Sequence, residues 1–289
     1  MRLLAFGATG QVGRELVRAA EARGHRLEAL GREAADLADP EACAARIADT
    51  DAEAVINAAA HTAVDRAESE PDLAHAINAA APGAMARAAA ARALPFLHVS
   101  TDYVFDGRPG PVWTEEDAPA PVSVYGASKL AGEAAVAEAG GVHVILRTAW
   151  VFSAHGSNFV KTMLRVGPGR ESLQVVDDQR GGPTPARAIA EALLTVAEAF
   201  RSGNGTPGLF HFSGTPPVSW AEFAEAIFAE AGGPAPRIER IPSSAWPVPA
   251  RRPANSVLDC RRIAAAYGIA QPDWRDALPE VVAELRETT

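Results

Sequence analysis

The feature that most constrains the fold is a glycine-rich turn close to the start of the chain. A short apolar run, Leu3 to Phe6, leads into the segment GATGQVG (7–13), and a helical pattern continues from Val12 to Arg23. Glycines in this GxxGxxG spacing, between a strand and a helix, let backbone N–H groups approach a pyrophosphate at the helix N-terminus. The turn predicts a dinucleotide site with the candidate contacts Gly7, Thr9, Gly10, Gln11, Val12 and Gly13.

Strand-like and helical runs alternate through the first half of the chain. Short apolar runs at 26–30, 54–58, 95–100 and 142–147 alternate with helical patterns at 40–48, 71–92 and 124–139. This order predicts βαβ units and therefore an α/β fold with a Rossmann-type doubly wound parallel sheet. Because such sheets bind ligands at the carboxyl ends of their strands, the residues after each apolar run are the candidates for chemistry.

The composition of the sequence changes after residue 150, where turns rich in glycine and proline become frequent. A further strand is expected at 174–176, a helix at 185–200, and a helix at 219–231 with Ser219 as its N-cap. We expect residues 1–150 to form the dinucleotide-binding Rossmann domain. Residues from about 174 to 200 are expected to belong to the same domain. Residues 151–289 are expected to form mainly a smaller, partly interleaved α/β substrate-binding lobe.

Charge and composition exclude several classes of function. The net charge of −9 makes the chain a poor candidate for electrostatic binding to nucleic acid. No apolar window reaches the length of a membrane span, and the N-terminal apolar run is too short for a signal sequence. We expect a cytoplasmic protein that binds a small molecule rather than a membrane and that can form a homodimer. Cys43 and Cys260 are expected to be reduced thiols.

The strongest catalytic signal is the pair Tyr125 and Lys129, a YxxxK motif at the start of a helical pattern. Side chains four residues apart share one helix face, so the ammonium is expected close to the phenol and is expected to lower its pKa. A tyrosine tuned in this way can exchange a proton during carbonyl reduction. Thr101, which follows the strand at 95–100, is the expected third member, because its hydroxyl can bond the carbonyl or the tyrosine.

The residues after Thr101 distinguish between two reactions. Sugar-nucleotide dehydratases of the short-chain dehydrogenase superfamily usually carry Asp-Glu at this point, an acid–base pair for removing water. Here the sequence reads Asp102-Tyr103. A ketone reduction needs no such pair, so the sequence favours a reductase.

The choice between NADH and NADPH depends on the end of the second strand. An acidic residue there would bind the ribose 2′-hydroxyl of NADH. The strand ends instead at Leu30-Gly31-Arg32, and Arg32 can hold a 2′-phosphate. The sequence therefore favours NADPH, while Glu33 or Asp36 can still reach the ribose and keep NADH open.

Candidate substrate contacts lie after the last strand of the first half. Trp150 offers a flat ring for a sugar or base, with core packing as the alternative. Asn158, Lys161, Arg251 and Arg252 are further candidates in the second half. Because a nucleoside diphosphate needs cationic partners, Arg252 or Lys161 is preferred. His98, inside an apolar strand, is interpreted as a hydrogen-bonded core histidine.

Together these motifs resemble one family, dTDP-4-dehydrorhamnose reductase, over residues 1 to about 275. The resemblance is carried by FGATGQVG (6–13), NAAAHTAVDRAESEP (57–71), STDYVFDG (100–107), VYGASKLAGE (124–133), RTAWVF (147–152), NFVKTMLR (158–165), DDQRGGPT (177–184) and ARRPANS (250–256). The run from 57 to 71 is the most specific. Gly31 departs from the pattern, because many members carry an acid after the second strand.

The resemblance implies reduction of dTDP-4-dehydro-β-L-rhamnose to dTDP-β-L-rhamnose, the last step of that nucleotide sugar's synthesis. It implies that Tyr125 donates the proton, that Lys129 assists it and holds the nicotinamide ribose, and that Thr101 tunes it. Further cofactor contacts are implied at Gly10, Gln11, Val12, Asp36, Leu37, Ala60, His61 and Thr62, and substrate contacts at Thr101, Asp102 and Trp150. Some members use Mg²⁺, so the resemblance allows Mg²⁺ without placing it.

Two alternatives stay open at this point. The first is a reductase of another 4-keto sugar nucleotide. The second is a non-catalytic subunit, since a regulatory subunit of methionine adenosyltransferase resembles the same family. The intact set of Tyr125, Lys129 and Thr101 favours an enzyme.

Overall fold

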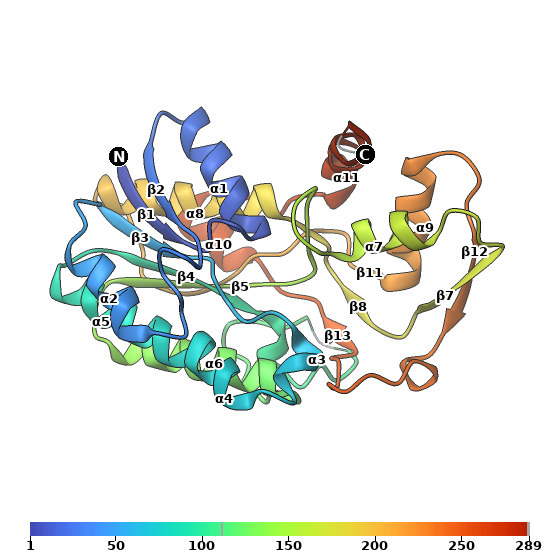
Figure 1. Cartoon of the computed structure of the whole chain (residues 1–289), viewed down its shortest axis with the longest axis horizontal. Coiled ribbons are helices and arrows are strands. Elements are labelled where there is room, and N and C mark those ends of the chain that lie inside the picture. Colours follow the sequence, from blue (N-terminus) through green and yellow to red (C-terminus); the bar gives the residue numbers. More distant parts are fainter. Residues whose placement is uncertain (111, 288–289) are drawn as a thin grey trace.

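The computed structural model describes residues 1–110 and 112–287 and has two lobes of unequal size (Figure 1). The larger, the sheet lobe, is built on six parallel strands in the spatial order β10-β5-β4-β3-β1-β2. These strands are β1 (Arg2–Phe6), β2 (Arg26–Leu30), β3 (Ala54–Asn57), β4 (Phe96–Thr101), β5 (His143–Thr148) and β10 (Gly208–His211). The expected Rossmann-type doubly wound α/β fold is confirmed.

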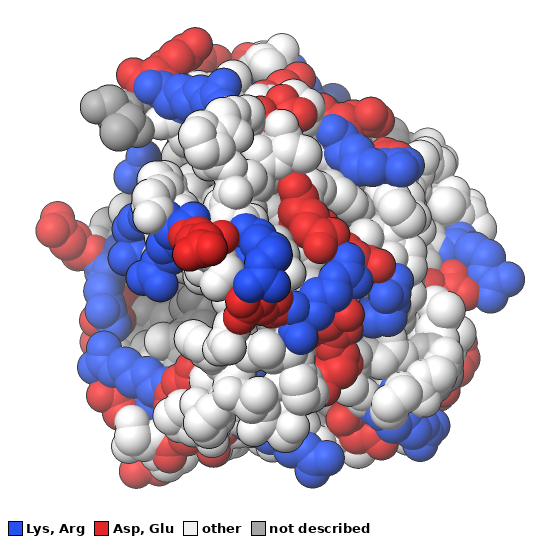
Figure 2. All heavy atoms as spheres, turned by 90° about the vertical axis from the view of Figure 1, so that its right-hand side faces the viewer, with Lys and Arg blue, Asp and Glu red and all other residues white. Residues whose placement is uncertain are grey.

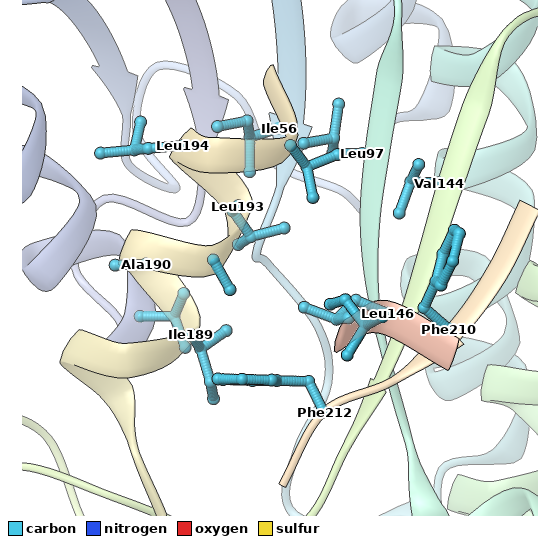
Figure 3. Close-up of a cluster of buried hydrophobic side chains, with 14 of the residues drawn as sticks. Ile56, Leu97, Val144, Leu146, Ile189, Ala190, Leu193, Leu194, Phe210 and Phe212 are labelled. Carbon is cyan, nitrogen blue, oxygen red and sulfur yellow. The ribbon is translucent and has the colours of Figure 1, made fainter. Parts of the chain in front are cut away.

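Helices cover both faces of this sheet (Figure 1). One face is covered by α1 (Gln11–Ala22), α8 (Ala186–Arg201) and α10 (Arg261–Tyr267), and the other by α2 (Pro40–Ala48), α5 (Ala81–Ala91) and α6 (Val124–Glu138). Figure 3 shows the first face, where Ile189 and Leu193 of α8 point toward Leu97 and Leu146 of the central strands. Strands buried on both faces explain the continuous apolar runs of the sequence.

The alanine-rich stretch expected as one helix at 71–92 contains a change of helix type. It divides into α4 (Pro71–His75), a π-helical turn η1 (Ala76–Ala80) and α5. Pro82 has no N–H group to donate to the carbonyl of Asn78 four residues earlier, which explains why the α-helical ladder is interrupted here. The short helix α3 (Val64–Ala67) precedes α4, and the 3₁₀ turn η2 (Asp102–Val104) follows β4.

The smaller lobe, here called the small lobe, has a core of its own. It contains α7 (Phe159–Val166), β7 (Ser172–Val176), α9 (Trp220–Ala231), β12 (Arg237–Ile241) and α11 (Trp274–Glu287). Strand β7 pairs with β12 in parallel and so lies outside the six-stranded sheet. Ser219 caps α9 in a capping box with Glu222, as the sequence predicts for the N-cap.

Short pairings connect the two lobes. They involve β6 (Val151–Phe152), β8 (Arg180–Gly181), β9 (Thr184–Pro185), β11 (Val218–Ser219) and β13 (Asn255–Ser256), and the turn η3 (Ser243–Ala245) follows β12. The chain passes from the sheet lobe to the small lobe and back, because α8 and β10 return to the large sheet. On the small-lobe side of the molecule, acidic and basic side chains are interspersed rather than separated by sign (Figure 2).

Two further properties concern the described residues. None of their helices is long and apolar enough to cross a bilayer. Cys43 and Cys260 are both buried free thiols, as the sequence suggests.

Candidate active site

The glycine turn lies where the strand order of the sheet reverses, between β1 and β3. Gly7 has φ of +96°, and a Cβ added there would lie 2.8 Å from the backbone nitrogen of Ala59, just after β3. A Cβ on Gly13 would lie 2.0 Å from the carbonyl oxygen of Gly7. Both positions therefore require glycine, one for the backbone conformation and one for the close packing of α1 on the turn.

The N-terminus of α1 fits an anionic group. Gly10, which has no side chain, takes the N-cap position, so the first-turn N–H groups of α1 are not covered by a capping side chain. Thr9 and Gly10 are exposed, and Gln11 is partly exposed. Exposed N–H groups at the positive end of a 12-residue helix form a suitable cradle for a pyrophosphate.

The segment after β3 lies beside this turn and is fixed by one buried side chain. The amide of Asn78, in η1, accepts from the backbone N–H of His61 (2.8 Å) and donates to its carbonyl (3.1 Å). Ala60 and His61 are partly exposed and Thr62 is exposed. The buried Nδ1 of His61 has no hydrogen-bond partner among residues 1–110 and 112–287, which leaves a polar atom for a ligand.

The ribose end of the candidate cofactor site carries one exposed cation. Arg32 follows β2 by two residues, and its Nε lies 3.5 Å from Asp36 Oδ1. Asp36 also accepts from the backbone N–H of Ala38, while Leu37 is buried in the core. Because this ion pair has a long N–O distance and is exposed to solvent, it is weak, and the Arg32 guanidinium can turn toward a phosphate.

Thr101, Asp102 and Tyr125 meet at the end of β4. The Thr101 hydroxyl donates to Asp102 Oδ1 (3.0 Å) and lies close to the Tyr125 side chain, whose pKa it lowers. Ser123 caps α6 and so fixes the start of the helix that carries Tyr125. The structure thus brings together three of the residues that the sequence proposed for catalysis and substrate binding.

The pKa of Tyr125 differs from the sequence expectation. Burial raises the pKa of the Tyr125 phenol to about 12, the nearby Thr101 hydroxyl opposes the rise, and the charge of Asp102 adds to it. The expectation that Lys129 lowers this pKa is therefore wrong for this structure. Burial also raises the pKa of the Asp102 carboxyl to about 6, against the hydrogen bond from Thr101 that lowers it. A phenol with a raised pKa is a protonated donor at neutral pH.

Lys129 lies on the same helix as Tyr125, but its hydrogen bonds go to β4. The Nζ atom donates to the carbonyl of Val99 (2.7 Å) and lies 3.2 Å from Nε2 of His98. The side chain is 1% exposed, and burial lowers its pKa to about 8, although the charge of Glu133 raises it.

A buried ion pair holds α6 against the sheet, and nothing in the local sequence pattern pointed to it. Glu133, one turn after Lys129, forms a bidentate pair with Arg147 of β5 at 2.9 and 2.7 Å. Ser100, directly before Thr101, donates to the same carboxylate at 2.5 Å. Asn78 was also missed; its amide donates to Ser128 of α6. The one available signal was a polar residue inside an otherwise apolar, alanine-rich stretch.

Gln11 ties the glycine turn to the small lobe. Its side-chain nitrogen donates to the Val151 carbonyl (3.3 Å), and its oxygen accepts from Ser153 and from Asn158 (2.8 Å). Asn158 also caps α7 through the backbone N–H of Lys161. Asn158 is therefore placed beside the cofactor turn, where its interactions are with protein groups.

Three candidate substrate contacts remain: Trp150, Lys161 and Arg252. Trp150 follows β5, stacks on Trp220 of α9 at 3.4 Å between ring centroids, and abuts Gly181. Its packing agrees with the core alternative, although part of the residue remains exposed. Lys161 donates to the carbonyl of Ala154 (3.1 Å). Arg252 pairs with Asp65 (2.7 Å), and its buried Nη1 has no partner among the described residues.

Metal binding finds no support in the described residues. No group of three or more His, Cys, Asp or Glu side chains in residues 1–110 and 112–287 is arranged to hold a metal ion. The Mg²⁺ that the family resemblance allows therefore has no assigned ligands among these residues.

Comparison with known proteins identifies the family. The family described as RmlD substrate binding domain matches residues 1–287. A dTDP-4-dehydrorhamnose reductase of Burkholderia thailandensis is 46% identical, and the match covers 99% of each chain.

Two crystal structures of similar proteins agree with this match. A dTDP-4-dehydrorhamnose reductase of Clostridium acetobutylicum has 34% identity, covers 99% of this chain and 100% of its own, and superposes with a TM-score of 0.91. The dTDP-4-dehydrorhamnose reductase of Bacillus anthracis, in complex with NADP, has 32% identity and also a TM-score of 0.91. The match covers 98% of this chain and 99% of that one. The chain therefore belongs to the RmlD substrate binding domain family, the family of the dTDP-4-dehydrorhamnose reductases.

Proposed function

We propose that this protein reduces the C4 ketone of dTDP-4-dehydro-β-L-rhamnose to give dTDP-β-L-rhamnose, with a nicotinamide cofactor as reductant. The observation that carries the proposal is the meeting of Tyr125, Thr101 and Asp102 at the end of β4, in a chain that matches reductases of this name over its full length. A bound reduced nicotinamide supplies the hydride for the ketone carbon.

Tyr125 is the proposed proton donor in this reaction. Its raised pKa keeps the phenol protonated at neutral pH, so it can hand a proton to the oxygen that becomes negative as the ketone is reduced. The Thr101 hydroxyl lies close to this phenol, and we propose that it bonds the same oxygen. Asp102 is a proposed substrate contact, because its Oδ2 is buried without a partner among the described residues and can accept from a sugar hydroxyl.

The proposed cofactor site runs along the carboxyl ends of the central strands. The pyrophosphate is assigned to the N-terminus of α1, at Gly10, Gln11 and Val12, and Ala60, His61 and Thr62 to the wall beside it. Asp36 and Leu37 are assigned to the adenosine end. We propose NADPH as the preferred cofactor, because Arg32 is exposed and Gly31 stands where an acid would repel a 2′-phosphate.

The proposed substrate site lies between Tyr125 and the small lobe. Arg252 is the favoured diphosphate ligand, because its unpartnered Nη1 can donate to a phosphate while Nη2 stays paired with Asp65. Asn158, Lys161 and the exposed part of Trp150 are proposed as further contacts.

Substrate profiling tests the proposal. The protein is incubated with NADPH or NADH and with the 4-keto-6-deoxy sugars of dTDP, GDP or UDP, and cofactor oxidation is followed by absorbance at the nicotinamide band. We expect turnover with dTDP-4-dehydro-β-L-rhamnose and a higher kcat/KM with NADPH. Faster turnover of another base or sugar would establish the first alternative. No turnover, together with tight binding to an adenosyltransferase, would establish the second.

A further inference from the structure

The short helix α3 carries two acidic side chains whose partners lie in different parts of the candidate active site. This helix lies at the end of the sheet lobe that is nearest the small lobe (Figure 1). Asp65 is in α3, and Glu68 is its C-cap residue. Side chains three positions apart in a helical turn lie on one face, so the two carboxylates project from the same side of α3. Both belong to the specific run at 57–71, and the proposed function does not use them.

Glu68 holds the start of the helix that carries Tyr125. Its Oε1 accepts from the backbone N–H of Val124, the first residue of α6, at 2.8 Å. The N–H groups of a first helical turn have no partner within the helix and need an acceptor from elsewhere. Ser123 accepts from Gly126, and Glu68 accepts from Val124. A negative carboxylate is also favoured at this positive end of α6.

The same first turn packs closely against the turn that follows β4. A Cβ added to Gly126 would lie 2.1 Å from the carbonyl oxygen of Tyr103. The rings of Tyr103 and Tyr125 meet edge to face, with 5.4 Å between their centroids. The first turn of α6 is therefore held by η2 and by Glu68 of the α3 segment. These two contacts fix the backbone of Tyr125 and keep its phenol near Thr101.

Asp65 holds a different part of the candidate substrate site. Its Oδ1 accepts from the backbone N–H of Ala250 at 3.1 Å, and its Oδ2 accepts from Nη2 of Arg252 at 2.7 Å. The Arg252 side chain is 21% exposed, and its buried Nη1 has no partner among the described residues. One carboxylate thus fixes both the backbone of this segment and the guanidinium, so Nη1 has a set position relative to α3.

Helix α3 therefore connects two groups that the substrate must reach at the same time. Under the proposed function, the ketone lies at Tyr125 and the diphosphate lies at Arg252. The segment from Asp65 to Glu68 is a single helical turn, anchored by the fully buried Ala67, so its two carboxylates move together. A link of this kind sets the separation between the proton donor and the cation.

We propose that Glu68 and Asp65 are positioning residues, through which α3 matches the separation of the Tyr125 phenol and the Arg252 guanidinium to the span from ketone to diphosphate in the substrate. Glu68 acts through α6 on the reduction step. Asp65 acts through Arg252 on the binding of the diphosphate. The inference rests on the proposed function for the identity of the substrate, whereas the contact of Glu68 with α6 is measured without any ligand.

Hydrogen exchange in the unmodified protein tests the role of Glu68 without a variant. The first N–H of a helix ordinarily exchanges quickly, because it has no partner within the helix. We expect the Val124 N–H, observed by NMR of ¹⁵N-labelled protein, to exchange at least about a hundredfold more slowly than in an unfolded chain, because Glu68 accepts from it. Unprotected exchange at Val124 would overturn the role of Glu68.

Two variants of Glu68 test its effect on catalysis. Glu68→Gln keeps an oxygen acceptor for Val124, and Glu68→Leu removes it. We expect kcat to fall at least about tenfold in Glu68→Leu and to stay within about threefold in Glu68→Gln, since a small misplacement of the proton donor slows the reaction strongly. The Kd of NADPH should stay within about twofold in both, because the pyrophosphate cradle at α1 is unchanged. Glu138→Leu, the same change at an exposed position late in α6, should alter neither quantity.

Asp65→Asn tests the other contact. The variant removes the charge that pairs with Arg252 and turns an NH₂ group toward the guanidinium or toward Ala250. We expect the Kd of dTDP, measured by calorimetry, to rise at least about fivefold, because the guanidinium is no longer held in the binding position. The single-turnover rate at saturating substrate should stay within about threefold, because Tyr125 is still held by Glu68. Asp72→Asn, the same change at an exposed position of α4, should alter neither.

Each outcome decides between positioning and a simpler role. A kcat within about twofold of normal in Glu68→Leu, or a parallel loss of kcat and NADPH affinity, would overturn the role of Glu68. A Glu68→Gln as slow as Glu68→Leu would assign the effect to charge and would also overturn it. Tighter binding of dTDP by Asp65→Asn would show that the carboxylate only competes with phosphate for Arg252, which contradicts the role of Asp65.

The remaining outcomes separate this inference from the proposed function. If Glu68→Leu does not fold, the exchange of Val124 in the unmodified protein decides the role of Glu68. If the unmodified protein shows slow exchange at Val124 but neither binds dTDP nor reduces its 4-keto sugar, the proposed function fails and the contact of Glu68 with α6 stands. If it binds and reduces that sugar while the variants behave like their controls, the further inference fails alone.

Discussion

The buried pair of Glu133 and Arg147 allows a quantitative prediction about stability. Both side chains are almost fully buried, and two charge-assisted hydrogen bonds of 2.9 and 2.7 Å join them. Glu133→Gln keeps the size of the side chain but turns an NH₂ group toward the Arg147 guanidinium and leaves its charge unpaired. Breaking one partner of such a buried pair costs about 3–5 kcal/mol in the free energy of unfolding. Ser100 donates to the same carboxylate, so a third polar group depends on this pair.

The double variant Glu133→Met with Arg147→Met is the control. It removes both charges, so we expect it to cost clearly less than the sum of the single Met variants, with a coupling of about 2 kcal/mol or more. Urea unfolding followed by far-UV circular dichroism measures all four proteins. A cost below ~1 kcal/mol for Glu133→Gln, or additive single and double variants, would refute the view that this pair holds α6 against β4 and β5.

Three further predictions concern individual positions. Gly13→Ala should weaken cofactor binding at least tenfold, because its Cβ would lie 2.0 Å from the Gly7 carbonyl oxygen; fluorescence titration with NADPH measures this, and unchanged affinity would contradict the tight turn. Ser219→Ala should lower the free energy of unfolding by about 1 kcal/mol through loss of the α9 capping box, and an unchanged urea midpoint would speak against it. Asp102 has a folded-state pKa of about 6, raised from 3.8, so its ionisation destabilises the fold as the pH rises between these values. Asp102→Asn should therefore gain up to about 3 kcal/mol relative to the unmodified protein between about pH 4 and 7, and a stability difference that is flat with pH would disprove this assignment.

Local pattern was enough to predict the elements that carry the site. Apolar runs ending in Gly7 and Thr101 predicted β1 and β4, and the YxxxK motif predicted the start of α6. These signals are local, since the apolar pattern of a strand, the glycine turn and the spacing of Tyr125 and Lys129 each depend on a few neighbouring residues.

What the sequence could not supply were contacts between distant segments. Lys129 was expected beside Tyr125 because the two share a helix face, yet its hydrogen bonds go to His98 and Val99, about thirty positions earlier in the chain. The raised pKa of Tyr125 was missed for the same reason, because burial is a property of the packed fold. Asn57 belonged to the strand expected at 54–58, and its hydrogen bond to His98 exists only because β3 and β4 are paired.

The most direct test of the account is single-turnover reduction of dTDP-4-dehydro-β-L-rhamnose by NADPH in the unmodified protein and in Tyr125→Phe. The account predicts formation of dTDP-β-L-rhamnose by the unmodified protein. It also predicts a loss of at least about a hundredfold in the rate of the variant, with NADPH affinity unchanged. Full turnover by Tyr125→Phe, or no product from the unmodified protein, would contradict the central claim that the Tyr125 phenol delivers the proton to this ketone.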